Sequence, residues 1–426
     1  MTTPQAHVST LANGVRVVAL ALPQLESASA SVFVRTGSAC ESARESGISH
    51  VVEHMAFKGT QSRDCQRINL DAERLGAEVN AHTDKDHTAF HMRGLAQHAT
   101  TFVAMLGDIV CASTFPEAEL ERERQVILHE VDEDDDDPLA TAFKLFDRAC
   151  YGNHPAAQPV IGRRRNIERF TRADIQSYVQ RQYTGANIVV GVAGAIDPAA
   201  VHAAAEAAFS TLPKGEVNRV AAPVYAGGVR LKRQTGSSQT HAVIGFPIPS
   251  LADDDAASVV AAALFGEGMS SPLMDALRER RALVYYAACS ADRTPWGGQF
   301  VIEASTAPRH LDELVAEVAR LLVEQTRAID PIGLERARNQ LAVRRVQALE
   351  RPPRLIEDAA QDLFVHGRVR SRAEQAAQVD AVTADAVRDA FRRMLAATPA
   401  VAVAGRLGKG LQAGQRFGDL LAAGRR

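Results

Sequence analysis

Two histidines and a glutamate fall at a spacing that could bind a metal ion and use it. The run His50-Val51-Val52-Glu53-His54 lies within the apolar segment 47–57. If this segment is a helix, His50 and His54 project from one face about one turn apart, and Glu53 flanks that face. Two imidazole nitrogens and a neighbouring carboxylate base are the groups that a catalytic zinc centre requires. The alternative is a solvated helix face that carries two unrelated histidines.

A catalytic zinc site usually has three protein ligands, so a third should come from another element. The segment 118–130 is rich in strong helix formers and predicts a helix. Glu123 and Glu130 are seven residues apart and therefore share one face of it. Periodicity alone does not choose between Glu123, Glu130 and Glu133 as the ligand.

The order His-x-x-Glu-His is that of the inverzincins. Together with the string Glu123-Arg124-x-Val126-Ile127-x-x-Glu130, it resembles the family of pitrilysin, insulin-degrading enzyme and mitochondrial processing peptidase. The string from His54 to Thr60 is especially similar to the processing-peptidase branch. The resemblance implies that His50, His54 and Glu130 bind one Zn²⁺ per chain and that Glu53 is the general base. It also implies that Glu123 steadies one of the ligands from outside the metal's own shell.

The segment Asn80-Ala81-His82-Thr83 matches the Asn-Ala-x-Thr strand of this family. The resemblance implies that Asn80 and Ala81 lie on an exposed edge strand, which pairs with the backbone of an extended peptide. Strand addition binds peptides through main-chain hydrogen bonds and makes few demands on their sequence. By pattern alone, the segment is an ordinary hairpin strand.

A second resemblance lies near residue 280. Arg278 and Tyr285 match the Arg and Tyr that in the family contact the substrate and the carbonyl under attack. A cation and a phenol can stabilise a tetrahedral oxyanion, and this is the favoured interpretation; a surface Arg and a core Tyr are the alternative. Two positions depart from the family pattern, because Pro272 stands where relatives often have Arg and Ala282 where they usually have Gly.

Two further clusters could suggest other metals. His82, His87 and His91 are close in sequence, but no carboxylates stand at ligand spacing beside them, so a second metal is the less favoured interpretation. The acidic run 132–137 lacks the glycine and the terminal glutamate of a calcium loop. We expect it to be a solvated helix end that is closed by Pro138.

Composition limits the class of protein. With 426 residues the chain suits two domains, and 46% hydrophobic residues suffice for proper cores. A net charge of −3 without a basic block gives no sign of a nucleic-acid partner. No apolar run approaches the roughly 20 residues of a membrane span, and the N-terminus lacks the features of a secretory signal. Five scattered cysteines favour reduced thiols and a cytoplasmic location.

The order of predicted elements repeats along the chain. The apolar strand 400–405 resembles 189–194, and Leu334-Glu335-Arg336-x-Arg338 echoes Leu120-Glu121-Arg122-x-Arg124. Helices are also predicted over 69–75 and 271–281. We expect an α+β protein of two homologous domains, each a mostly antiparallel sheet packed with helices. Residues 1–215 carry the zinc motif; residues 216–426 lack it and carry the Arg/Tyr pair.

The resemblance covers nearly the whole chain and implies a zinc endopeptidase that forms half of a clamshell around an unfolded peptide. Because this chain carries both sets of residues, a homodimer with two complete sites is the simplest arrangement, and a heterodimer with a paralogue is the competitor. A non-catalytic, chamber-forming or peptide-binding subunit is the alternative function. Such family members typically lose the base or a ligand, whereas His50, Glu53, His54 and Glu130 are all present here.

Overall fold

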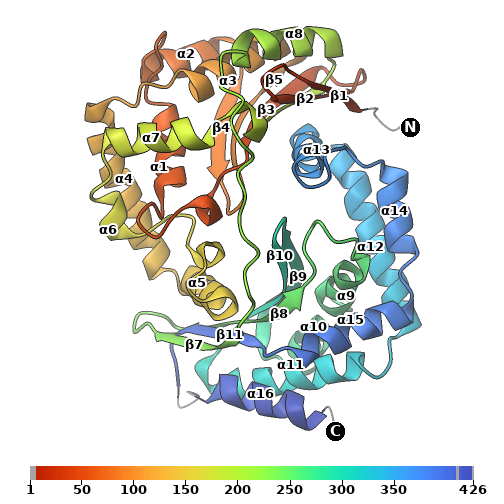
Figure 1. Cartoon of the computed structure of the whole chain (residues 1–426). Coiled ribbons are helices and arrows are strands. Elements are labelled where there is room, and N and C mark those ends of the chain that lie inside the picture. Colours follow the sequence, from red (N-terminus) through yellow and green to blue (C-terminus); the bar gives the residue numbers. More distant parts are fainter. Residues whose placement is uncertain (1–5, 409–411, 425–426) are drawn as a thin grey trace. The chain divides into compact units, whose positions relative to one another are not determined.

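The chain forms two compact units in the computed structural model, which describes residues 6–408 and 412–424 (Figure 1). Each unit contains one β-sheet packed with helices, so the predicted α+β class is confirmed. The units are built from residues 1–131, 158–220 and 346–372, and from residues 132–157, 221–345 and 373–426. No helix in the described part of the chain has the length and apolar content of a membrane span.

The first unit is built around a six-stranded sheet with the order β1-β2-β6-β3-β5-β4. Neighbouring strands are antiparallel except β2 and β6, which are parallel. The turn between β1 and β2 uses Gly14, whose φ of +92° lies in the left-handed region that glycine adopts without strain. The strands are β1 (Ala6–Thr10), β2 (Arg16–Ala21), β3 (Ser27–Val34), β4 (Glu78–Thr83), β5 (Thr88–Leu95) and β6 (Ile188–Gly194).

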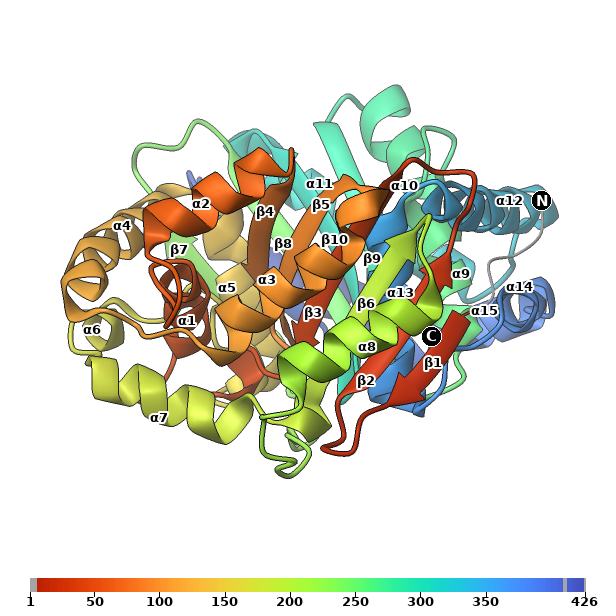
Figure 2. The same ribbon diagram turned by 90° about the horizontal axis from the view of Figure 1, so that it is seen from above.

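Helices cover both faces of this sheet. On one face, α3 and α8 lie across the strands, as Figure 2 shows from above, and Phe102 and Leu106 of α3 pack with Phe90 of β5 in a common core. On the other face lies α13, which comes from the second half of the sequence. A Cβ added at Gly191 of β6 would lie 2.1 Å from Cγ2 of Ile356, so this glycine lets α13 approach closely. The helices are α1 (Ile48–Ala56), α2 (Cys65–Arg74), α3 (Ala99–Cys111), α4 (Glu117–Asp136), α6 (Arg164–Ile167), α7 (Arg172–Gln182), α8 (Pro198–Phe209) and α13 (Pro352–His366).

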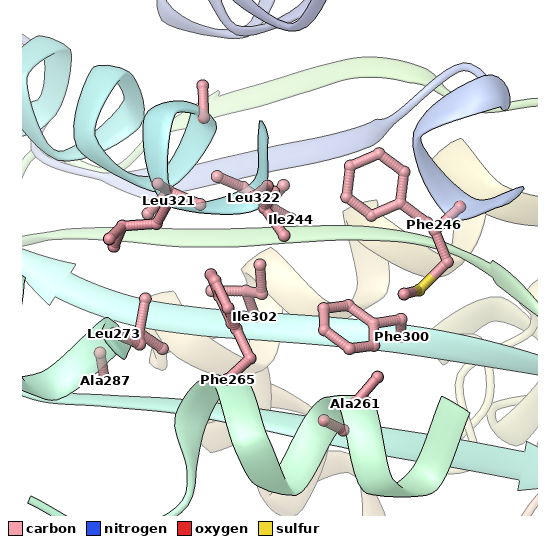
Figure 3. Close-up of a cluster of buried hydrophobic side chains, with 14 of the residues drawn as sticks. Ile244, Phe246, Ala261, Phe265, Leu273, Ala287, Phe300, Ile302, Leu321 and Leu322 are labelled. Carbon is pink, nitrogen blue, oxygen red and sulfur yellow. The ribbon is translucent and has the colours of Figure 1, made fainter. Parts of the chain in front are cut away.

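The second unit is built around a five-stranded sheet with the order β7-β11-β8-β10-β9. Its main core holds the aromatic rings of Phe265, Phe300 and Phe391 in mutual contact, and Figure 3 shows two of them with their aliphatic neighbours. Helix α5 packs on β11, β8 and β7. The elements are β7 (Gly228–Arg233), β8 (Thr240–Ile248), β9 (Val284–Thr294), β10 (Gly297–Thr306), β11 (Ala400–Gly405), α5 (Pro138–Tyr151), α9 (Ala256–Gly266), α10 (Pro272–Met274), α11 (Leu311–Gln325), α12 (Pro331–Leu349), α14 (Arg372–Asp380), α15 (Ala384–Ala396) and α16 (Ala413–Gly424).

Two helix predictions need correction. The helix expected over 69–75 begins earlier, at Cys65, because the Asp64 side chain accepts a hydrogen bond from the Arg67 amide and caps it. The helix expected over 271–281 is a short turn, α10, followed by π-helical backbone over Asp275–Arg280. The Ser271 hydroxyl caps this segment by accepting a hydrogen bond from the Met274 amide.

The acidic run lies where helix α4 ends and α5 begins. Asp134 and Asp135 both form ion pairs with Lys144, each at 2.7 Å. Asp137 caps α5 by accepting a hydrogen bond from the Leu139 amide, and Pro138 occupies the first turn of that helix. The expected helix end is therefore present, and these carboxylates serve local structure.

The compact units do not follow the order of the sequence strictly. Helix α5 belongs to the second unit although it precedes residue 215, and α13 belongs to the first although it follows that residue. No helix or strand lies between Phe209 and Gly228, where the sequence analysis places the boundary. The division into domains at 215/216 stays a prediction.

Candidate metal centre

Helix α1 buries one face in the core, and its other face carries His50, Glu53 and His54. Ile48, Val51, Val52 and Met55 are fully buried in the core of the first unit, so the opposite face carries the polar side chains. A carboxylate shortly before the helix fixes its start, because buried Glu41 accepts hydrogen bonds from an amide of the first turn and from that of the residue preceding the helix.

Those two hydrogen bonds run from the amides of Gly47 and Ser49 to Glu41 and measure 2.7 and 2.8 Å. Gly47 has a φ of +103°, and a Cβ there would lie 2.8 Å from Cα of Gly162. The start of α1 therefore packs directly against another backbone segment, which only glycine permits. Sequence analysis missed Glu41, because no local spacing connects it to the motif.

His50, His54 and Glu130 come together at one point. The Glu130 Oε2 atom lies 3.7 Å from His50 Nε2 and 3.5 Å from His54 Nε2. Ligands of a zinc ion, bound at about 2.0–2.2 Å in a tetrahedron, are separated by roughly 3.3–3.5 Å, so these three side chains fit the metal. Throughout the described residues, this is the only such group of three or more potential ligands. Glu133 is not part of it.

The electrostatics of His50 suit a metal ligand. Burial, with a further contribution from His54, lowers the pKa of His50 to about 4, so the ring stays neutral and keeps a lone pair. Its Nδ1 atom is buried without a hydrogen-bond partner among the described residues. The other nitrogen, Nε2, is the one that faces Glu130.

His54 is oriented by a chain of charged groups. Its Nδ1 lies 3.1 Å from Glu123 Oε2, and the Lys58 ammonium lies 2.7 Å from the other oxygen of Glu123. Because a carboxylate only accepts hydrogen bonds, His54 must carry its proton on Nδ1, which leaves the Nε2 lone pair toward Glu130. The structure thus places Glu123 behind a ligand. Lys58 was not assigned a role from the sequence, although it lies one turn after His54.

Glu53 lies beside the three ligands and is held by a strand. The hydroxyl of Thr83, at the end of β4, donates a hydrogen bond of 2.6 Å to Glu53 Oε2. Burial raises the pKa of Glu53, as does the nearby charge of Glu130, while the Thr83 hydrogen bond and His54 act in the opposite sense. Burial outweighs these, which makes Glu53 a stronger base than an exposed carboxylate.

Strand β4 forms one edge of the first sheet and pairs only with β5 within that sheet. Its outer row of backbone groups therefore lies open, as the peptide-binding interpretation requires. Asn80 and Ala81 lie in the middle of this strand, and the Asn80 Oδ1 atom accepts a hydrogen bond of 2.8 Å from the backbone amide of Ala81.

Arg278 and Tyr285 come into contact in the second unit. The Arg278 guanidinium carbon lies 4.9 Å from the centroid of the Tyr285 ring, and Tyr285 is 82% exposed. The π-helical turn carries Arg278, and β9 carries Tyr285. Between them, Ala282 has a φ of +51°, a left-handed conformation that glycine adopts with less strain than alanine. Pro272 occupies the first turn of α10, where its missing amide donor costs nothing.

An inverted His-x-x-Glu-His helix, completed by a glutamate from a second helix, defines the class of this protein as that of the zinc proteases. The insulinase family model (peptidase family M16) matches residues 16–164, and the peptidase M16 inactive domain matches residues 169–341. The chain belongs to peptidase family M16, so the resemblance drawn from the sequence is confirmed.

Individual relatives agree with this assignment. An uncharacterized zinc protease of Rickettsia felis is 30% identical over 365 residues, covering 85% of this chain and 88% of that protein. The mitochondrial-processing peptidase subunit beta of Saccharomyces cerevisiae is 28% identical over 404 residues, covering 90% and 87%. The crystal structure of a protease from Helicobacter pylori shares the fold, with a TM-score of 0.86 at 20% identity, over 95% of this chain and 100% of that one.

Proposed function

We propose that this chain is a zinc-dependent endopeptidase that hydrolyses unfolded peptides or precursor segments. The observation that carries the proposal is the cluster of His50, His54 and Glu130, with Glu53 beside it and fixed by Thr83. A zinc ion held by the three ligands would supply Lewis acidity, which makes water acidic near neutral pH and polarises a peptide carbonyl. One such ion per chain is expected.

The side chains of this unit would perform the proton transfers. Glu53 takes a proton from the attacking water and passes it to the leaving amine. Because Thr83 occupies Oε2, the other oxygen of Glu53 remains available for the water. Glu123 holds the tautomer of His54 that presents Nε2, and Lys58 balances the charge of Glu123.

Substrate binding would rest on two features. The open edge of β4, with Asn80 and Ala81 at its centre, would add an extended peptide as a further strand. Arg278 and Tyr285 would steady the developing oxyanion, since their contact pre-orients a cation and a phenol on an exposed surface. A homodimer with two complete sites is the simplest assembly, and the similarity to a processing-peptidase subunit makes a heterodimer the alternative.

The test compares wild type with Glu53→Gln on a pool of unstructured peptides, with cleavage followed by mass spectrometry and zinc measured on the same samples. We expect cleavage by wild type alone and one zinc ion in both proteins. Glu73→Gln on α2 is the matched control, because Glu73 is exposed and remote from the motif in sequence, and it should cleave normally.

An inert wild type that holds zinc would overturn the proposal for the isolated chain. It would favour a subunit that needs a catalytic or activating partner. Cleavage by Glu53→Gln at the wild-type rate would remove Glu53 from the mechanism.

A further inference from the structure

A chain of hydrogen bonds joins three histidines on the first sheet. Ser31 Oγ lies 2.8 Å from His91 Nδ1, and His91 Nε2 lies 2.9 Å from His82 Nδ1. His82 Nε2 lies 3.1 Å from His87 Nε2, and His87 Nδ1 lies 2.8 Å from Asp86 Oδ1. Every ring nitrogen of the three histidines therefore has a partner.

The cluster lies on the face of the sheet opposite the candidate zinc centre. Successive residues of a strand point to opposite faces, so His82 and Thr83 of β4 diverge. Thr83 reaches Glu53, whereas His82 pairs with His91 of the neighbouring strand, two positions from its register partner Ala89 and therefore on the same face. The two groups of histidines are thus separated by the sheet itself.

Asp86, at one end of the chain of hydrogen bonds, determines which group donates and which accepts in each bond. Asp86 can only accept, so His87 donates from Nδ1, and its Nε2 in the neutral ring accepts from His82. His82 then accepts from His91 at Nδ1, and His91 accepts from the hydroxyl of Ser31. Each of the three rings can be neutral and fully bonded in this arrangement.

We propose that His82 and His87 bind a divalent transition-metal ion through their Nε2 atoms. At metal–nitrogen distances of about 2.0–2.1 Å and a tetrahedral angle, two such atoms stand about 3.3–3.4 Å apart, close to the 3.1 Å observed. Imidazole nitrogens suit Zn²⁺, Ni²⁺ and Cu²⁺, with Cu²⁺ bound most tightly. The described residues add no third side chain within ligand range, so water completes the shell.

The outer contacts match those that metal-bound histidines require. Asp86 accepts from His87 Nδ1–H, which is the carboxylate–histidine pairing that fixes a ligating imidazole. When the metal takes Nε2 of His82, the proton of that ring moves to Nδ1 and donates to His91, which in turn donates to Ser31. The number of protons is unchanged, and only the hydrogen bond between His82 and His87 is lost.

The surroundings favour a cation at this position. Burial lowers the pKa of His87, but its hydrogen bond to Asp86 and the charges of Asp84 and Glu357 outweigh this and raise it overall. The charges of Asp84, Asp86 and Glu357 also act on His82 in the sense that favours positive charge. Binding at this site does not depend on peptidase activity.

Equilibrium dialysis against Ni²⁺ tests the proposal, with full-length protein that already holds one zinc ion and with bound metals measured by mass spectrometry. We expect wild type to bind one Ni²⁺ in addition to zinc. The variant His82→Gln/His87→Gln should keep its zinc and lose the Ni²⁺. His7→Gln, which removes an exposed histidine of β1, should bind Ni²⁺ like wild type.

Asp86→Asn keeps both proposed ligands and covers the case in which the double variant fails to fold. We expect it to retain zinc and to bind Ni²⁺ about 10- to 100-fold more weakly, as for other outer partners of metal-bound histidines. Additional Ni²⁺ retained by the double variant, or none in wild type, would overturn the site. So would an unchanged Ni²⁺ affinity in Asp86→Asn.

Discussion

The two sheets share one topology but differ in what the neighbouring helices carry. The order β2-β6-β3-β5-β4 in the first unit corresponds to β7-β11-β8-β10-β9 in the second, and in each unit only the first of these pairs is parallel. After β3 comes α1, with two histidines and a glutamate. After β8 comes α9, Ala256–Gly266, which contains no ionisable residue and is almost wholly buried.

The long helices α4 and α12 are also anchored in the same way but carry different side chains. Arg124 donates to the carbonyl oxygens of Ile167 and Phe170, just before α7, and Arg338 donates to that of Val382, just before α15. These arginines mark equivalent positions, since they occupy the echoed sequence strings.

Counted from these arginines, the positions in α12 that correspond to Glu123 and Glu130 of α4 carry other residues. Glu123 precedes Arg124, whereas buried Ala337 precedes Arg338. Six residues further on, Glu130 corresponds to Arg344, which forms an ion pair with Glu267. Backbone topology and an anchoring arginine are therefore retained without the ligands, so a few side chains decide which unit can hold a metal.

The largest expected effect comes from removing a proposed metal ligand of the first unit and comparing it with a substitution at an equivalent position in the second. His54→Asn should abolish both zinc binding and peptidase activity, because it removes one of the three protein ligands that a catalytic zinc site uses. Arg344→Gln, at the equivalent of the third ligand, should leave zinc content and activity unchanged. Zinc analysis and peptide cleavage on the same samples decide, and loss of zinc in Arg344→Gln would contradict the equivalence.

The start of α1 should make the stability of the protein depend on pH. The start of α9, which has no side-chain cap, should not. Burial raises the pKa of Glu41 to about 8, although the amides of Ser49 and Gly47 favour its charged form. Because the folded-state pKa exceeds the unfolded value of about 4.5, the folded state binds the proton more tightly. This contribution to stability is complete below pH ~4.5 and is lost as the pH rises toward ~8, by up to about 1.4 kcal/mol per pH unit.

Denaturant unfolding of metal-free protein between pH 5 and 8 checks this. Glu41→Gln should be less stable than wild type at low pH, since its amide cannot accept from both backbone donors, and it should lack this component of the pH slope. Parallel pH profiles of the two proteins would show that Glu41 does not titrate in this range.

A substitution at Glu123 tests the contact that orients the His54 ring. Glu123→Gln should lower zinc affinity or kcat/KM about 10- to 100-fold, because the amide holds the His54 ring less firmly. Ala337→Ser, at the equivalent position of the second unit, should change neither quantity. A competitive zinc titration with a chelator measures the affinity, and an unchanged value with unchanged activity would argue against the positioning role.

The smallest expected effect concerns backbone strain in the second unit. Ala282→Gly should stabilise the chain by up to about 1 kcal/mol, because glycine adopts a φ of +51° without the penalty that a Cβ imposes. The greater freedom of glycine in the unfolded chain offsets part of that gain. The midpoint of denaturant unfolding measures the change, and a lower midpoint would contradict it.

Local spacing predicted the parts of the site that lie on one element. The separation of His50 and His54 indicated a shared helix face, and the separation of Glu123 and Glu130 did the same for α4. Spacing could not say which glutamate meets the histidines, because that depends on how two helices pack. The structure brings Glu130 to both imidazoles, in agreement with the family resemblance.

Several contacts of the motif helix were beyond sequence analysis, because folding and not spacing brings the partners together. Glu41, Thr83 and Lys58 act on the motif helix or its ligands through pairings that no periodicity encodes. The sequence analysis recognised the histidine cluster but did not favour a metal there, because no carboxylate stands at ligand spacing. The structure shows Asp86 as the partner of His87. The π-helical turn over 275–280 was missed because its composition is that of an ordinary helix.

Helix α13 belongs to the first unit but is encoded late in the sequence, and this affects how the chain folds during synthesis. During synthesis from the N-terminus, Val18 and Val189 have no cover on one sheet face until α13, with Ile356 and Leu363, leaves the ribosome. A fragment ending at residue 215 would expose that face permanently, so an isolated half should aggregate. A functional split of this chain would therefore have to graft α13 onto the first half.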